Sequence, residues 1–263
     1  MAKLIFLGTS SAVASLGREN THLLLVGSQS VVMVDCGGNP LRRLAEAEIP
    51  YQDLTDLILT HFHPDHVSGL PMLLMQMWIL GRKEPLNIYG LHHTLLRVNK
   101  MMDLFDWEDW NNLFPVVLHH LPGDELAPVM EEGEFSIKSS PVQHMIPTLG
   151  LRIEHLPTGF TVAYSSDTDP CPATAALSRD ADILIHEAAG AFPGHSTPEE
   201  AGGIAQRARA GALYLVHYPL HGSTREELAA AARKSFPGQV VVAQDLMAID
   251  LEDSAGSGFT SLQ

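Results

Sequence analysis

Four side chains able to bind a metal stand within six consecutive positions, and this run constrains the chain more than any other feature. Residues 61–66 read His-Phe-His-Pro-Asp-His and follow the apolar stretch 57–60, which the sequence predicts as a strand. Imidazole and carboxylate ligands without thiolates suit zinc, manganese or iron in an open site. Four ligands from so short a segment cannot all reach one ion, so the run predicts a two-ion centre. A solvated histidine-rich loop without metal is the alternative.

Strand and helix patterns alternate along the whole chain, which is typical of an α/β protein. Strands are expected over residues 4–7, 22–26, 31–35, 57–60, 88–89, 116–119, 135–139, 151–154, 160–165, 183–185, 213–216 and, last, 240–243. Helices are expected over residues 40–47, 67–80, 94–113, 174–177, 198–209 and 226–234. No linker interrupts the pattern, so we predict one domain over residues 1–253. A flexible tail rich in Gly and Ser is expected over 254–263.

Composition limits the class of partner and the compartment. The formal net charge of −15 argues against a polyanion, because proteins hold phosphate backbones mainly with clustered Lys and Arg. Cys36 and Cys171 have neither metal-type spacing nor the pattern of a disulfide framework, which favours a reduced, cytoplasmic setting. The longest apolar run, residues 70–80, is too short to cross a membrane. We therefore expect no membrane association.

Polar side chains also end several later strands, where α/β sheets hold their functional sites. These strand-end residues are His144, Asp167, His186, Glu187 and His217. Each alone is more often a turn residue or a helix cap. Together with the run at 61–66 they predict a single site.

These motifs resemble the metallo-β-lactamase superfamily and, within it, the ribonuclease Z branch and its phosphodiesterase relatives. The matching segments extend from residues 8–12 to His217 and include 34–37, 166–168, 186–188 and 194–197. The resemblance implies a four-layer αβ/βα sandwich that holds two divalent ions, zinc first, with manganese and iron as alternatives. One ion would bind His61, His63, His144 and Asp167. The other would bind Asp65, His66, Asp167 and His217, so that Asp167 bridges the pair.

Two departures from ribonuclease Z point away from tRNA. In ribonuclease Z, a long arm that grips tRNA is inserted between the histidine motif that corresponds to His144 and the bridging aspartate. Only residues 150–166 lie there in this chain, and 156–159 read as a plain hairpin turn. The early loop keeps only Arg18 and Asn20, without the family's Pro and Lys. A small-molecule or short nucleotide phosphodiester is therefore the expected substrate, and long nucleic acid is not. The resemblance also suggests a homodimer.

The resemblance further suggests roles in an in-line attack of hydroxide on a phosphodiester. Asp65 would orient or deprotonate the nucleophile, and His195 would protonate the leaving oxygen or stabilise the transition state. Glu187 would hold His195 in its useful tautomer. Other functions stay open at this point: a tRNA 3′-processing endoribonuclease, an arylsulfatase, a thioester or lactone hydrolase, and a metal-binding regulatory protein without turnover. The segment with Trp107 and Trp110 could be a lid or a dimer contact.

Overall fold

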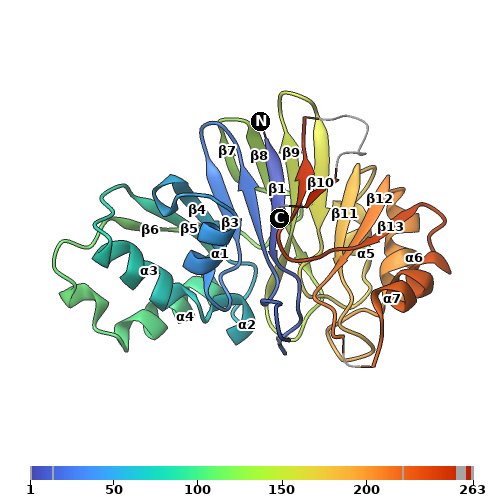
Figure 1. Ribbon diagram of the computed structural model, residues 1–263, viewed down its shortest axis with the longest axis horizontal. Coiled ribbons are helices and arrows are strands. Elements are labelled where there is room, and N and C mark those ends of the chain that lie inside the picture. Colours follow the sequence, from blue (N-terminus) through green and yellow to red (C-terminus); the bar gives the residue numbers. More distant parts are fainter. Residues whose placement is uncertain (1, 14, 221, 253–258, 262–263) are drawn as a thin grey trace.

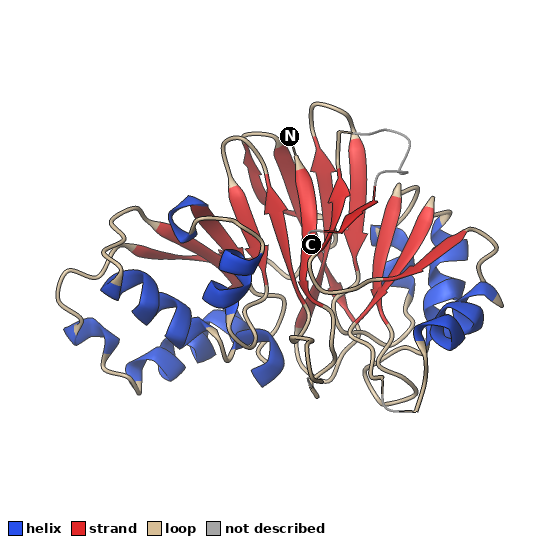
Figure 2. Ribbon diagram, in the orientation of Figure 1, coloured by secondary structure: helices blue, strands red, loops and turns tan. Residues whose placement is uncertain are grey.

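Two sheets packed face to face, with helices on both outer faces, form the protein (Figures 1 and 2). The computed structural model describes residues 2–13, 15–220, 222–252 and 259–261. This arrangement confirms the predicted α/β class and the four-layer αβ/βα sandwich. The extent of the single domain, residues 1–253, stays a prediction.

The first sheet has eight strands in the order β15-β14-β1-β2-β3-β4-β5-β6 within the described residues. They are β1 (Lys3–Gly8), β2 (His22–Val26), β3 (Val31–Val34), β4 (Leu54–Ile58), β5 (Leu86–Leu91), β6 (Val116–Leu121), β14 (Met247–Asp250) and β15 (Phe259–Ser261). The segments between its parallel strands carry α1 (Pro40–Glu46), the 3-10 helix η1 (Tyr51–Asp53), α2 (Pro64–Val67), α3 (Leu70–Ile79), α4 (His92–Asp103) and the 3-10 helix η2 (Trp107–Asp109).

The second sheet has seven strands in the order β13-β12-β11-β10-β9-β8-β7, again within the described residues. They are β7 (Ala127–Glu132), β8 (Phe135–Val142), β9 (Thr148–His155), β10 (Phe160–Tyr164), β11 (Ile183–Glu187), β12 (Ala212–Val216) and β13 (Gln239–Val242). Its helices are α5 (Pro172–Leu177), α6 (Pro198–Ala208) and α7 (Arg225–Arg233). Capping boxes begin α6 at Thr197 and α7 at Thr224, where each hydroxyl accepts from the backbone N–H three residues on.

Three apolar cores hold the layers together. The largest lies between the sheets, where the rings of Phe6 in β1 and Tyr214 in β12 stack with centroids 5.9 Å apart. A second core lies between the first sheet and its helices, and a third between the second sheet and α6 and α7. Alternate residues of β1 therefore belong to different cores, as the period of two in a strand requires.

The parallel strands place their following loops at one end of the sandwich. Strands β3 to β6 run parallel in the first sheet, and β10 to β13 run parallel in the second. Their carboxyl ends point toward the lower edge of Figure 1, where α2 and several long loops gather. The predicted ligands, Glu187 and His195 belong to α2, to the last residue of β11 or to a loop after β4, β8, β10, β11 or β12. His186, which was also expected at the site, lies inside β11 and belongs to neither group of metal-capable side chains. The topology thus brings both sheets to one site.

Several sequence-based boundaries were wrong. The helix expected over 67–80 begins at Leu70 as α3, and Val67 is the last residue of α2. The helical hydrogen bonds are interrupted between them, because the N–H of Gly69 donates to the carbonyl oxygen of Cys36 at 2.8 Å. The helix expected over 94–113 ends at Asp103, and Asp106 then adopts a left-handed φ of 49°. Trp110 stacks on Trp78 with centroids 5.2 Å apart, so its segment packs against α3.

The carboxyl-terminal part of the chain also differs from the expectation. Strand β13 is followed by β14, which pairs with β1, and by β15, which pairs with β14. The expected flexible tail over 254–263 lies outside the described residues except for β15. Strand β7 was also missed, and Pro128 within it stands beside an irregularity in the pairing with β8.

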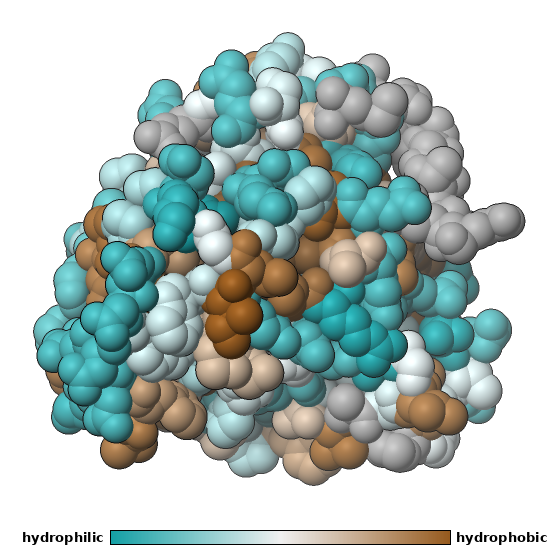
Figure 3. Space-filling view, turned by 60° about the vertical axis from the view of Figure 1, so that its left-hand side comes forward, coloured by the Kyte–Doolittle hydropathy of each residue, from teal (hydrophilic) through white to brown (hydrophobic). Residues whose placement is uncertain are grey.

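The net charge of −15 is consistent with a polar surface on the face drawn in Figure 3. Figure 3 shows hydrophilic residues over most of one face, with apolar side chains gathered near its centre and along its lower edge. None of the helices in the described part of the chain combines the length and apolar character needed to span a bilayer.

Neighbouring glycines in α6 offer a test of the contact between α6 and α7. A Cβ at Gly202 would lie 2.3 Å from the carbonyl oxygen of Ala232, whereas a Cβ at Gly203 would meet nothing within 4 Å. We expect Gly202→Ala to lower the free energy of unfolding by about 1–3 kcal/mol, because the helices must separate. Gly203→Ala should raise it by roughly 0.5–1 kcal/mol through helix propensity. Urea denaturation of both variants measures the difference, and equal stabilities would contradict the close contact.

Candidate metal centre

One group of metal-capable side chains surrounds His61. It consists of His61, His63, His144 and Asp167, whose ligand atoms all lie within 4.8 Å of one another. These residues come from the loops after β4, β8 and β10, so both sheets contribute. The structure therefore brings together side chains that are up to 106 positions apart, from His61 to Asp167.

A second group shares one member with the first. It consists of Asp65, His66, Asp167 and His217, with ligand atoms again within 4.8 Å of one another. Asp167 Oδ2 lies 3.4 Å from Nε2 of both His66 and His217, and 3.7 Å from Nε2 of His61. The shared carboxylate makes the two groups consistent with a dinuclear metal site. All seven predicted ligands belong to these two groups.

Buried polar atoms that lack hydrogen-bond partners support a dinuclear metal site. Nε2 of His61, Nε2 of His66 and Oδ1 of Asp167 are inaccessible to solvent and have no hydrogen-bond partner among the described residues. Buried polar atoms in folded proteins are nearly always paired, so these atoms require a partner such as a bound ion. The mixture of imidazole and carboxylate suits zinc, manganese or iron.

The protonation states also fit cation binding. Burial lowers the pKa of His61 well below its usual value and that of His217 to about 4, so both rings are neutral at pH 7. Burial alone would raise the pKa of Asp167, but the neighbouring His217 and His66 outweigh it and hold that pKa well below its usual value. His61 and His217 are thus neutral and Asp167 is ionised, as metal ligation requires. His66 differs: burial opposes its charge, but Asp167 and Asp35 raise its pKa well above the usual value, so a metal ion would have to displace a proton from this ring.

Asp35, at the end of β3, orients two of these histidines. Its carboxylate accepts from His66 Nδ1 at 2.8 Å and from the hydroxyl of Thr60 at 2.9 Å. The Thr60 oxygen in turn lies 3.0 Å from His61 Nδ1, from which it accepts a hydrogen bond. Both rings therefore carry their proton on Nδ1 and leave Nε2 free for a metal. Sequence reasoning placed Asp35 in a matching motif but assigned it no role.

Strained backbone marks the same strand ends. Asp35 has a φ of 63°, and Ser166 and His217 each have a φ of 53°. Left-handed backbone of this kind costs a non-glycine residue on the order of 1–3 kcal/mol and persists where surrounding contacts over-determine it. Each residue lies at the end of a strand, where the turn directs a polar side chain into the site.

Glu187 and His195 lie beside the two groups without belonging to them. His195 Nδ1 is 3.1 Å from Glu187 Oε1, and the His195 ring packs against those of His144 and His217 at centroid distances of 5.0 and 5.7 Å. Burial raises the pKa of Glu187 to about 7. Burial opposes protonation of His195, but its hydrogen bond to Glu187 and that carboxylate's charge raise its pKa. The pair can hold a proton at the edge of the metal centre.

Arg18, which the early loop retains, is engaged in holding that loop. Its guanidinium is buried, donates to the carbonyl oxygens of Thr9 and Tyr218, and lies 4.1 Å from the centroid of the Tyr218 ring. Tyr218 directly follows His217, so Arg18 fastens the early loop to the loop that carries a candidate ligand.

Comparison with known proteins places the chain in a family. The family described as "Anti-Pycsar protein Apyc1" matches residues 2–236. The chain belongs to this family. As a member of the Apyc1 family it also resembles the ribonuclease Z of Methanothermobacter thermautotrophicus, with 28% identity over 312 aligned positions that cover 96% of this chain and 97% of the relative.

Solved structures confirm the fold of this Apyc1-family protein. The metallo-β-lactamase fold protein YhfI from Bacillus subtilis superposes with a TM-score of 0.79 at 24% identity, covering 94% of this chain and 98% of YhfI. The short form of human tRNase Z superposes with a TM-score of 0.76 at 25% identity, covering 95% and 99% of the two chains. The protein therefore has the metallo-β-lactamase fold and is related to ribonuclease Z.

Asp35 provides a test of the candidate centre. We expect Asp35→Asn to lower the affinity for divalent ions about 10–100-fold, because the negative charge is lost and an NH2 group replaces one of the two accepting oxygens. That NH2 group would face either the backbone N–H of Thr60 or Nδ1 of His66, both of which donate to the carboxylate. Both ions should be affected, since His61 and His66 belong to different groups. Competition with a chromogenic chelator measures the affinities. Asp124→Asn, which removes an exposed carboxylate elsewhere, is the matched control. Unchanged affinity in Asp35→Asn would contradict the orienting role.

Proposed function

We propose that this protein is a metal-dependent phosphodiesterase that hydrolyses small nucleotide phosphodiesters, cyclic nucleotides among them. The observation that carries the proposal is the pair of ligand groups that share Asp167. Two divalent ions close together can stabilise both the attacking and the leaving oxygen of an in-line displacement at phosphorus. Zinc is the first candidate, with manganese and iron as alternatives.

The size of the substrate follows from what surrounds the site. Strands β9 and β10 pair directly as a hairpin, with Phe160 opposite His155, where the resemblance to ribonuclease Z predicts the tRNA-gripping arm. The alignment with the archaeal ribonuclease Z spans 312 positions against 263 residues here, so that relative carries inserted segments. The net charge of −15 also disfavours the binding of a long polyanion.

The chain's own residues supply positioning and proton transfer. When bound, the ions would polarise a phosphoryl oxygen and lower the pKa of water to about 7. Asp65 Oδ2 lies 3.5 Å from His66 Nε2, and its side chain is 12% exposed, so it can also reach a water at the site. Asp65 would orient that water and take its proton. His195, 14% exposed, would protonate the leaving oxygen, while Glu187 holds its ring.

Other expectations accompany this proposal. Cys36 and Cys171 are both buried and unpaired, which supports the expected reducing compartment. The homodimer, and the choice between a lid and a dimer contact for the segment with Trp107 and Trp110, stay predictions.

A substrate panel tests the reaction class. We expect the protein loaded with zinc or manganese to hydrolyse bis(p-nitrophenyl) phosphate and a 3′,5′-cyclic nucleotide, and to lose this activity in EDTA because the ions are removed. Initial rates should be measured beside p-nitrophenyl sulfate, a thioester, a lactone, nitrocefin and a precursor tRNA. Turnover of the thioester, lactone or sulfate without any phosphodiester turnover would overturn the proposal. Preferred cleavage of precursor tRNA would favour 3′-processing instead, and no turnover at all would favour a regulatory protein.

His195 tests the assignment of the proton donor. We expect His195→Ala to lower kcat for bis(p-nitrophenyl) phosphate by about 10²–10⁴-fold, the usual contribution of general acid catalysis. Its metal content should not change, because His195 belongs to neither ligand group. Elemental analysis and steady-state kinetics measure the two effects. His92→Ala, at an exposed histidine that belongs to neither ligand group, should match the wild type. Loss of metal in His195→Ala would contradict the assignment.

A further inference from the structure

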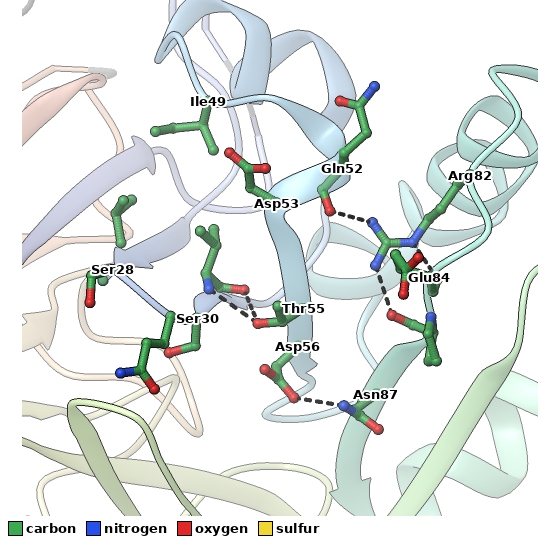
Figure 4. Close-up of a pocket in the computed structure, with 15 residues that line it drawn as sticks. Ser28, Ser30, Ile49, Gln52, Asp53, Thr55, Asp56, Arg82, Glu84 and Asn87 are labelled. Atoms are coloured by element: carbon green, nitrogen blue, oxygen red, sulfur yellow. Dashed lines mark hydrogen bonds between the residues drawn. The ribbon is translucent and has the colours of Figure 1, made fainter.

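A cavity of about 610 Å³ lies at the opposite end of the first sheet from the metal centre (Figure 4). The turn between β2 and β3, the first residues of β4 and β5, and the segment before β5 line it. The candidate ligands follow the carboxyl ends of strands, whereas this cavity lies at the amino ends of β4 and β5. Its volume is in the range of about 300–1,000 Å³ that is common for small-molecule sites.

Two buried acceptors at this cavity lack partners. Asp56 is 1% exposed and Ser30 is 6% exposed, and both belong to the residues that line the cavity (Figure 4). Asp56 Oδ2 and Ser30 Oγ have no hydrogen-bond partner among the described residues. The other oxygen of Asp56 accepts from Asn87 Nδ2 at 3.1 Å, which is a neutral donor. The carboxylate charge therefore has no cation in contact with it.

The guanidinium of Arg82, which also lines the cavity, already has hydrogen-bond partners. Arg82 donates to the carbonyl oxygens of Tyr51, Gln52, Leu54, Glu84 and Pro85, at distances of 2.6–3.2 Å. These five contacts use all five N–H donors of a guanidinium. Asp53 and Glu84 add two exposed carboxylates to the lining. The cavity therefore offers acceptors and negative charge, and no free guanidinium donor from Arg82.

We propose that this cavity binds a small organic cation with more than one ammonium group, such as a short aliphatic diamine. One ammonium would donate to Asp56 Oδ2 and Ser30 Oγ at the buried end, and the other would lie near the carboxylates of Asp53 and Glu84. A metal ion is a poorer match, because these carboxylates belong to neither of the compact ligand groups found in the described part of the chain. Charge-assisted hydrogen bonds to a buried carboxylate are stronger than neutral ones.

Isothermal titration of the metal-loaded protein with butane-1,4-diamine tests the proposal. We expect one equivalent to bind, and Asp56→Asn to weaken binding by about tenfold or more, since the charged acceptor is lost. Ser30→Ala should weaken it by roughly two- to fivefold through the loss of a neutral acceptor. Asp56→Asn keeps an oxygen for Asn87, so its fold and its hydrolysis of bis(p-nitrophenyl) phosphate should match the wild type.

Three controls separate this site from other sources of binding. Asp124→Asn removes one exposed carboxylate outside the cavity and should bind the diamine as the wild type does. Butane-1,4-diol has the same chain without charge and should not bind. A diamine held at the metal centre would bind Asp56→Asn with unchanged affinity. That result, equal binding of the diol, or no binding to the wild type would each overturn the proposal.

Discussion

The contact of one buried carboxylate with three imidazoles is the interaction on which the site depends. Asp167 Oδ2 lies within 3.4–3.7 Å of ring nitrogens of His61, His66 and His217, and all four side chains are nearly inaccessible to solvent. The neutral rings of His61 and His217 do not offset the charge of this carboxylate. Without a bound cation, only His66 does so, because Asp167 and Asp35 raise its pKa well above the usual value. The surrounding structure must therefore hold these side chains in place. A bound ion would stabilise the folded protein, because it binds the folded state and not the unfolded one.

Packing between the two sheets keeps these side chains in position. His217 follows β12 in the second sheet, whereas His61 and His66 follow β4 in the first, so the groups form only if the sheets keep a constant separation. The core between the sheets, with Phe6 stacked on Tyr214, fixes that separation. Arg18 adds a polar link between the early loop and the loop at Tyr218. Left-handed backbone at the strand ends then costs less than losing these contacts.

Agreement between sequence and structure was best where a local pattern carries the information. The run at 61–66 and the strand-end residues were visible because apolar strands of period two end abruptly in polar side chains. The end of α4 at Asp103 was missed, because apolar residues continue at near-helical spacing through 114 while a left-handed residue breaks the helix. The role of Asp35 was missed for another reason: its partner His66 is 31 positions away.

The sequence by itself determined the α/β class, the candidate metal ligands and the short β9–β10 connection, because each can be recognised from residues that are close together in the sequence. The resemblance to ribonuclease Z had already implied the two ligand groups that share Asp167, and the tertiary structure brings those groups together. Only the tertiary structure decided that Asp35 orients two histidines. It also decided that Asp56 and Ser30 are buried without partners. Burial and contact between distant strands depend on how the two sheets pack, and local sequence patterns carry no measure of that packing.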